Sequence, residues 1–294
     1  MADEREWLAA QFEGHRTYLR GMAYRMLGSR SEADDAVQEA WLRLSRSDVD
    51  AVKNLGGWLS TVVARVCLDM LRSRKSRREE SLETHGPKLI MSRQDERDPE
   101  REVALSESVG LALLVVLETL APAERVAFVL HDMFELPFDE IAPIVGRTEA
   151  AARQLASRAR RRVRGSSTVP AADLSRRNEV IEAFLAASRG GDFEALLAVL
   201  APDVVVRADR AAVPASAPTE VRGAPAVARN ALAFSGRARF AQVALVNGVP
   251  GIVVAPRGRL LTVLRFAIRH GRIVEIEVVA DPQRLRQLNL GIVN

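Results

Sequence analysis

Apolar residues recur every three or four positions through most of the first 165 residues, and this spacing predicts helices. The predicted helices cover residues 5–30 (as one helix or a pair), 31–46, 57–76, 105–120, 122–133 and 138–145, with another that begins near residue 148. Residues 79–104 have no clean period, are rich in charge and contain two prolines, so they are predicted to be a linker. The first part of the chain is therefore expected to be all-helical.

After residue 172 the pattern changes. A second linker is predicted at 166–172, and two helices follow it, over 175–189 and 192–200. The rest consists of β-branched runs separated by turn residues, at 204–208, 242–246, 251–255, 260–268 and 272–280. Two helices followed by several strands predict an α+β domain with a curved antiparallel sheet. The chain is thus predicted to be multidomain, with domains at 1–78, 105–165 and 173–294.

The helix predicted over 31–46 has two unlike faces. Its apolar stripe consists of Ala33, Val37, Ala40, Trp41 and Leu44. Ser31 is a suitable N-cap, and the acids of the first turn suit the helix dipole. Asp35, Gln38 and Glu39 point away from the stripe, so an anionic surface is expected there.

A helix-turn-helix unit is predicted around Gly146. The helix Phe138–Val145 has an apolar face, Gly146 permits a tight turn, and Thr148 can cap the next helix. The second helix buries one side through apolar residues at spacings of three and four, namely Ala152, Leu155, Ala159 and Val163. Six arginines with no interleaved glutamate occupy its other side. This composition favours a DNA-contacting helix over a solvated arginine face.

The charge distribution indicates two kinds of partner. The formal net charge is +4, but basic residues cluster at 72–78 and 153–164, whereas acids cluster at 32–39 and 79–107. Such blocks suggest separate surfaces for an anionic and a basic partner. The single cysteine, Cys67, cannot form an internal disulfide, which fits a reducing cytoplasm.

No metal, cofactor or membrane partner is expected. The four histidines are far apart and lack metal-ligand spacing. No apolar run reaches membrane-spanning length, and the acidic N-terminus does not resemble a signal peptide. We therefore expect a cytoplasmic protein.

Two segments together carry a family resemblance. The first is SEADDAVQEAWLRL followed by GWLSTVVARVCLDMLRSRKSRR, and the second is LETLAPAERVAFVLHDMFELPFDEIAPIVGRTEAAARQLASRARRRV. They resemble the first conserved module and the second DNA-binding module of bacterial sigma factors, over residues 8–165. Their order and spacing resemble the small extracytoplasmic-function group. In this family the polymerase supplies the active site, so the resemblance implies a transcription initiation factor without catalysis of its own.

The resemblance assigns roles to three sets of residues. The implied partners are promoter DNA and core RNA polymerase, which is contacted at its clamp coiled coil and its flap. The positions that match the clamp contact are Asp35, Gln38 and Glu39. The positions that match readers of the −10 element are Arg65, Asp69, Arg72, Arg74 and Lys75. The positions that match readers of the −35 element are Arg147, Thr148, Arg153, Gln154, Ser157, Arg158, Arg160 and Arg161.

These assignments have plainer alternatives. The acidic face of the helix 31–46 is also compatible with a surface that contacts only solvent. The basic residues at the end of the helix 57–76 are also explained by their favourable interaction with the helix dipole. The linker at 79–104 resembles a segment that enters the polymerase's RNA path, and a flexible tether is the alternative.

The last domain resembles a SnoaL-like domain. The stretch SRRNEVIEAFLAASRGGDFEALLAVLAPDVVV is similar to the opening of that cone-shaped fold, which is shared with nuclear transport factor 2. One sigma-factor subgroup carries such a domain, which sets the activity of the first two modules. The resemblance implies a regulatory tail at Asp281, Arg284 and Leu285, and a plain helix cap is the alternative.

SnoaL relatives include cyclases that use an acid–base residue in their pocket. Asp203, Asp209 and His270 are the candidates for acid–base chemistry. Lone carboxylates at strand ends are more often turn residues, so a small apolar ligand in the cone is favoured over catalysis. Two other functions stay open for the whole chain: a ligand-responsive helix-turn-helix regulator, and a SnoaL-type cyclase with a DNA-binding appendage.

Overall fold

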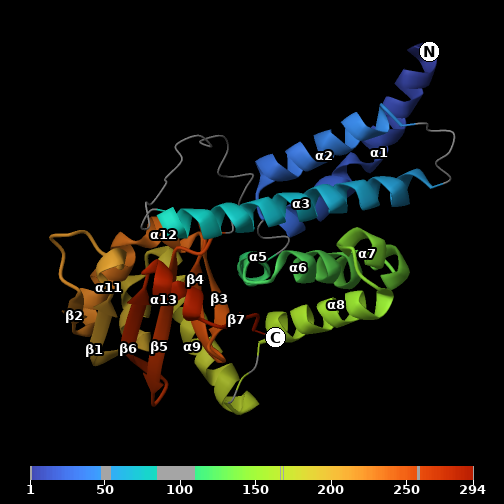
Figure 1. The fold of residues 1–294 in the computed structure, drawn as a ribbon. Coiled ribbons are helices and arrows are strands. Elements are labelled where there is room, and N and C mark those ends of the chain that lie inside the picture. Colours follow the sequence, from blue (N-terminus) through green and yellow to red (C-terminus); the bar gives the residue numbers. More distant parts are fainter. Residues whose placement is uncertain are drawn as a thin grey trace. The chain divides into compact units, whose positions relative to one another are not determined.

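A computed structural model describes residues 2–47, 54–84, 110–165, 167, 169–256 and 259–293, and for 2–5 and 78–84 it describes the backbone alone (Figure 1). The described residues form two compact units. The first unit falls within Met1–Asp95 and Leu120–Arg160, and the second within Glu96–Thr119 and Arg161–Asn294. The predicted succession of helical modules and an α+β domain is confirmed.

The first unit begins with three long helices that pack on one another. They are α1 (Ala2–Leu27), α2 (Arg30–Leu44) and α3 (Leu55–Thr84). Of the two alternatives for residues 5–30, the single helix is correct. The large side chains that fill the core among these helices include Phe12, Leu19, Met22, Met26, Leu59 and Leu68.

The start of α2 differs from the expectation. Gly28 has a φ of +73°, which ends α1, and Ser29 follows in an extended conformation. The N-cap is therefore Ser29, whose hydroxyl accepts a hydrogen bond from the Glu32 N–H at 3.5 Å, and the prediction of Ser31 was wrong. The predicted apolar stripe is buried, apart from Trp41, which is half-buried with its ring 5.1 Å from that of Phe12.

Helix α3 is longer than predicted at both ends. It begins at Leu55 and continues to Thr84, past residue 79, where the first linker was expected to start. No glycine or proline interrupts residues 58–85, so nothing in the sequence stops the helix there. The remainder of the predicted linker, up to residue 104, lies outside the described residues.

The first unit also contains the helix-turn-helix, whose predicted position is confirmed. Helix α6 (Pro122–Phe128) continues into a π-helical segment, Val129–Met133, and α7 (Phe138–Val145) follows. Gly146, with a φ of +67°, ends α7, and α8 (Glu149–Arg164) begins three residues later. The last turn of α8, from Arg161 onward, belongs to the second unit.

Within the first unit, α6 and α7 pack against α3. The Phe134 ring, in the turn after the π-helical segment, contacts α1 through Tyr18 in a T-shaped arrangement at 5.2 Å. The Arg25 guanidinium also lies over the Phe134 ring at 5.3 Å. Arg125 of α6 is 3% exposed.

Among the described residues of the second unit, seven strands form one sheet. The strands are β1 (Leu200–Ala208), β2 (Glu220–Arg222), β3 (Ala241–Val246), β4 (Val249–Val254), β5 (Thr262–Arg269), β6 (Arg272–Val279) and β7 (Leu290–Gly291). Their order is β2-β1-β6-β5-β4-β3-β7. The sheet was predicted to be antiparallel, but β1 pairs with β6 in parallel. This is possible because β1 and β6 are far apart in sequence and are not joined by a hairpin.

Helices cover one face of the sheet (Figure 1). The two predicted helices are α9 (Ala171–Gly190) and α10 (Phe193–Val199). The structure adds a 3-10 turn (Arg210–Ala212), α11 (Ala224–Ala233), α12 (Ser235–Ala238) and α13 (Pro282–Gln287), which were not predicted. The core between helices and sheet includes Ile181, Phe184, Leu196, Val227 and Phe266.

Helix α5 (Leu111–Glu118) belongs to the second unit and packs on β3 and β7. It lies in the segment 105–120 that was expected to open the helix-turn-helix module, and the earlier residues of that segment lie outside the described residues. Six of its eight residues are buried: Leu111, Ala112, Leu114, Val115, Val116 and Leu117. A helix that is apolar on all sides requires cover on all sides, which explains its place against the sheet.

Candidate polymerase and promoter interfaces

The acidic face of α2 is exposed. Asp35 and Gln38 are exposed and Glu39 is half-exposed. Glu39 accepts a hydrogen bond from the Arg43 Nε at 2.9 Å, and both side chains of this pair remain open to solvent. Because the opposite stripe of α2 is buried against its neighbours, the acidic face is held in a fixed orientation.

On α3, four of the five residues assigned to the −10 element lie on the surface. Arg65, Asp69 and Arg72 recur at spacings of four and three, so they share one face of the helix. Asp69 and Arg72 form an exposed ion pair at 3.7 Å. Lys75 is also exposed.

The opposite face of α3 is buried and apolar, and it includes Cys67. Burial raises the pKa of the Cys67 thiol to about 12 and outweighs the opposing effect of the nearby Arg125 charge. The thiol therefore stays protonated at neutral pH.

Arg74 is bound within the protein. Its Nη1 donates to the carbonyl oxygen of Leu27 at 2.9 Å, and its Nε donates to Glu32 Oε1 at 2.9 Å. The Arg74 side chain is only 21% exposed. These contacts join α3 to the end of α1 and the start of α2, so they account for this arginine without any DNA contact.

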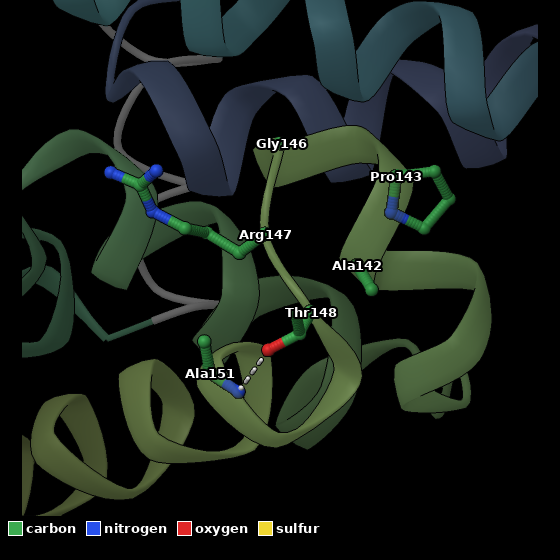
Figure 2. Close-up of a pocket in the computed structure, with 6 residues that line it drawn as sticks. All are labelled: Ala142, Pro143, Gly146, Arg147, Thr148 and Ala151. Carbon is green, nitrogen blue, oxygen red and sulfur yellow. Dashed lines mark hydrogen bonds between the residues drawn. The ribbon is translucent and has the colours of Figure 1, made fainter.

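The residues assigned to the −35 element surround the start and the outer face of α8. Most are exposed, namely Arg147, Thr148, Arg153, Gln154, Ser157, Arg158 and Arg161, and Arg160 is half-exposed. The expected cap is confirmed, since Thr148 Oγ1 accepts the Ala151 N–H at 3.3 Å. Figure 2 shows this bond at the turn, beside a shallow depression lined by Ala142, Pro143, Gly146, Arg147, Thr148 and Ala151.

Arg153, Arg158 and Arg160 of α8 are paired with carboxylates. Arg153 contacts Glu149 at 2.5 Å and lies over the Phe138 ring at 5.3 Å. Arg158 Nε donates to Glu124 at 3.0 Å, and Arg160 Nε donates to Asp132 at 2.6 Å. The hydrogen bond with Asp132 raises the pKa of Arg160 above its ordinary value.

The pairs of Arg158 and Arg160 join α8 to α6 and to the π-helical segment. Glu124 and Asp132 are well shielded, with side chains 8% and 19% exposed. Inspection of α8 alone could not reveal these pairs, because the acids lie 34 and 28 residues away in sequence. The two arginines therefore have a structural role in addition to any role at DNA.

The residues assigned to the regulatory tail form a short helix instead. Asp281 is the N-cap of α13, and its Oδ1 accepts the N–H groups of Gln283 and Arg284, both at 2.9 Å. Arg284 pairs with Glu277 of β6 at 2.5 Å, and Leu285 is half-buried. The structure thus shows Asp281 as a helix cap, and a regulatory role of these three residues stays a prediction.

The three acid–base candidates lie apart. Asp209, at the end of β1, accepts hydrogen bonds from the N–H groups of Ala280 and Asp281 at 2.9 and 2.7 Å. Its carboxylate therefore holds the backbone that follows β6 beside the end of β1. His270, with a φ of +50°, is exposed in the two-residue turn between β5 and β6, at the other end of β6. Asp203 is exposed on β1. The geometry does not assemble these residues into one site.

Among the described residues, no three His, Cys, Asp or Glu side chains gather as metal ligands do. None of the described helices combines the length and hydropathy that a membrane span needs.

Comparison with known families defines the class of protein. The model of Sigma-70 region 2 matches residues 11–77, and the model of Sigma-70, region 4 matches residues 110–163. These two matches contain α2 with its acidic face, most of α3, and the helix-turn-helix. The chain is therefore a sigma-70-type protein with both modules.

Relatives over nearly the whole length identify the group. The chain is 38% identical over 293 residues to the ECF RNA polymerase sigma factor SigJ of Mycobacterium tuberculosis, covering 94% of this chain and 92% of the relative. It is 36% identical to the probable ECF RNA polymerase sigma factor SigI of the same species, covering 96% of each. The crystal structure of Mycobacterium tuberculosis SigJ is similar with a TM-score of 0.45 and 36% identity, covering 94% of this chain and 98% of that one. The chain belongs to the extracytoplasmic-function sigma factor family.

Proposed function

We propose that this chain recruits core RNA polymerase to promoters through three surfaces: the acidic face of α2, the Arg65–Arg72 face of α3, and the start of α8. The observation that carries the proposal is the exposure of the first and third surfaces in one chain. On the acidic face of α2, Asp35 and the neutral Gln38 are exposed, and the helix that carries them is fixed by its buried stripe. An ordinary helix-turn-helix regulator has no need of such a surface.

The partner of the α2 face is proposed to be the basic clamp coiled coil of the polymerase. Charge complementarity of this kind speeds association and fixes the register of the two partners. Glu39 already has a cation beside it in Arg43, but this pair is exposed and weak. A basic surface can therefore compete for Glu39 at little cost.

At the −35 element, the turn and the first half of α8 are proposed to enter the major groove. Arg147, Gln154 and Ser157 are exposed and belong to residue types that read base edges or phosphates. Arg161, further along the helix, is suited to a phosphate. At the −10 element, Arg65 and Arg72 are proposed to hold the DNA backbone beside the opened strand.

Run-off transcription with purified core polymerase and a promoter library tests the proposal. With the wild-type chain, the transcribed promoters should share one −35 element and one −10 element. The Asp35→Lys variant should bind core polymerase about tenfold more weakly or worse, because its lysine would face the basic clamp coiled coil. Glu13→Lys is the matched control, because Glu13 is an exposed acid on α1 outside this face. Failure of the wild-type chain to bind core, combined with binding to duplex DNA alone, would favour a regulator instead.

The C-terminal domain is proposed to modulate the promoter-reading modules through its contacts with α5. Deletion of residues 173–294 would uncover the apolar side chains of α5, such as Leu111 and Leu114. We therefore expect the deletion to change promoter-dependent transcription, and equal activity of the two chains would contradict this. The binding of a small apolar ligand by this domain stays a prediction. Core side chains fill the space between the helices and the sheet, where such a ligand was expected to bind.

A further inference from the structure

The last turn of α8 lies beside the C-terminal residues of the chain (Figure 1), and a backbone hydrogen bond joins the two. The Ile292 N–H donates to the carbonyl oxygen of Val163 at 2.8 Å. Val163 lies in the last turn of α8, where backbone carbonyls have no donor within their own helix. A residue from the far end of the chain thus caps the helix that is proposed to read the −35 element.

Two glycines bring the backbones together at this point. A Cβ added to Gly291 would lie 2.7 Å from Gly165 Cα and 2.9 Å from Gly165 N. Contacts this short with backbone atoms cannot be relieved by a side-chain movement. Gly291 has no positive φ, so its small size, rather than its backbone conformation, is what this contact requires.

Strand β7 is itself firmly held. It pairs with β3, where Leu290 lies opposite Val246 and Gly291 opposite Leu245. Leu290 is 3% exposed. Next to the strand, the Asn289 N–H donates to Asn247 Oδ1 at 2.8 Å. The cap on α8 is therefore anchored in the sheet and is not a loose terminus.

The same edge of the sheet also holds α5. The Ala112 N–H, in the first turn of α5, donates to Gln242 Oε1 of β3 at 2.5 Å. This side chain takes the part of an N-cap, which Gly110 cannot supply. Strands β3 and β7 therefore secure both the first helix of the region 4 match and the last turn of its recognition helix.

We propose that Gly291 and Ile292 are positioning residues for promoter binding: they keep the last turn of α8 helical, so that Arg161 and Arg164 face DNA phosphates. Both arginines are exposed, and both lie in the turn that the Ile292 N–H closes. Without this cap the turn frays, and the two cations lose their fixed spacing. This inference rests on the proposed function of α8, and it gives the C-terminal domain a supporting role in DNA binding.

The test uses the full chain bound to core polymerase, with Gly291→Ala to separate the backbones and Ile292→Pro to delete the donor. Amide hydrogen exchange of residues 161–165 should quicken in both variants. Affinity for a duplex with the −35 sequence recovered from the promoter library should fall. The slope of log affinity against log salt should become shallower by about 0.9 for each phosphate that the variant no longer neutralises. Gly190→Ala is the control, because a Cβ there meets no atom within 4 Å.

A merely destabilised variant would bind less DNA with an unchanged salt slope, and that result would overturn the proposal. So would unchanged exchange in both variants, or faster exchange with wild-type DNA binding. A wild-type holoenzyme that selected no promoter would defeat the proposed function instead. In that case the exchange measurement would still decide whether the C-terminal residues order α8, so the two failures can be told apart.

Discussion

Helices α3 and α8 both carry arginines that the sequence assigns to DNA, but the two helices hold them differently. On α3, Arg65 and Arg72 lie on an exposed face, whereas Arg74 is turned inward, to Glu32 and Leu27. On α8, the arginines that pair with carboxylates are Arg153, Arg158 and Arg160. They lie among other exposed arginines of the same helix, such as Arg161.

This difference teaches that the number of arginines on a helix is not the number of cations available to DNA. A cation already paired with a shielded carboxylate must give up that partner before it can bind a phosphate, and the exchange returns little net energy. Helix α8 therefore uses part of its charge to hold the helix-turn-helix together. We call an arginine tied when it pairs with a carboxylate of the protein, and free when it is exposed and available to DNA. Substitution of a tied arginine should mainly lower stability, whereas substitution of a free arginine should mainly weaken DNA binding.

The largest effect is expected for Arg74→Ala. This change removes a partly buried ion pair and a charged hydrogen bond to the Leu27 carbonyl, so the free energy of unfolding of the first unit should fall by about 2–3 kcal/mol. Urea unfolding followed by tryptophan fluorescence measures this, since all three tryptophans (Trp7, Trp41 and Trp58) lie in the first unit. Arg72→Ala is the control and should change this stability by less than about 0.5 kcal/mol. Equal losses in the two variants would refute the distinction on α3.

Arg158→Ala should have the next largest effect. Glu124, whose side chain is 8% exposed, loses its charged partner but keeps the Ala121 N–H as a donor. Because the Arg158 side chain itself is exposed to 49%, we expect a loss of only about 1–2 kcal/mol in unfolding free energy. Arg161→Ala, on the same helix, should cost less than about 0.5 kcal/mol in the same assay. A stable Arg158→Ala variant would mean that the pair does not brace α8 against α6.

Local patterns in the sequence were sufficient for much of the fold. The period of apolar residues predicted the helices of both modules, and Gly146 with Thr148 predicted the turn and the cap of the helix-turn-helix. These features depend on residues within one or two turns of each other. The N-cap of α2 was missed by two residues because Ser29 and Ser31 are both suitable caps, and the φ of Gly28 decides between them.

Contacts between distant segments could not be predicted in this way. The partner of Arg158 lies 34 residues away, and the hydrogen bond from Ala112 to Gln242 joins residues 130 positions apart. Helix α5 is apolar on all sides, which indicates burial but does not specify the surface that buries it. For the same reason, the sequence identified the exposed arginines of α8 as a group and could not divide them into tied and free ones.

A smaller effect, on DNA binding alone, is expected for Arg161→Ala. With one phosphate fewer neutralised, binding to the −35 duplex should weaken by about fivefold and the salt slope should fall by about 0.9. Arg160→Ala should instead lower stability through the loss of its bond to Asp132 and leave the salt slope nearly unchanged. Fluorescence anisotropy over a salt series measures both variants. Arg269→Ala, an exposed arginine of β5, is the control. Equal salt slopes for Arg160→Ala and Arg161→Ala would contradict the prediction that only Arg161 neutralises a phosphate.

The smallest effect is expected for Glu149→Ala, which releases a tied arginine instead of removing one. Glu149 and Arg153 form an exposed pair one helical turn apart, so the loss in stability should not exceed about 0.5 kcal/mol. Arg153 is then free to meet a phosphate, and affinity for the −35 duplex should rise by about twofold while the salt slope steepens. Glu182→Ala, which removes an exposed acid from α9, controls for the general change in net charge. Unchanged binding would indicate that the Phe138 ring, 5.3 Å from the guanidinium, holds Arg153 in place without its carboxylate partner.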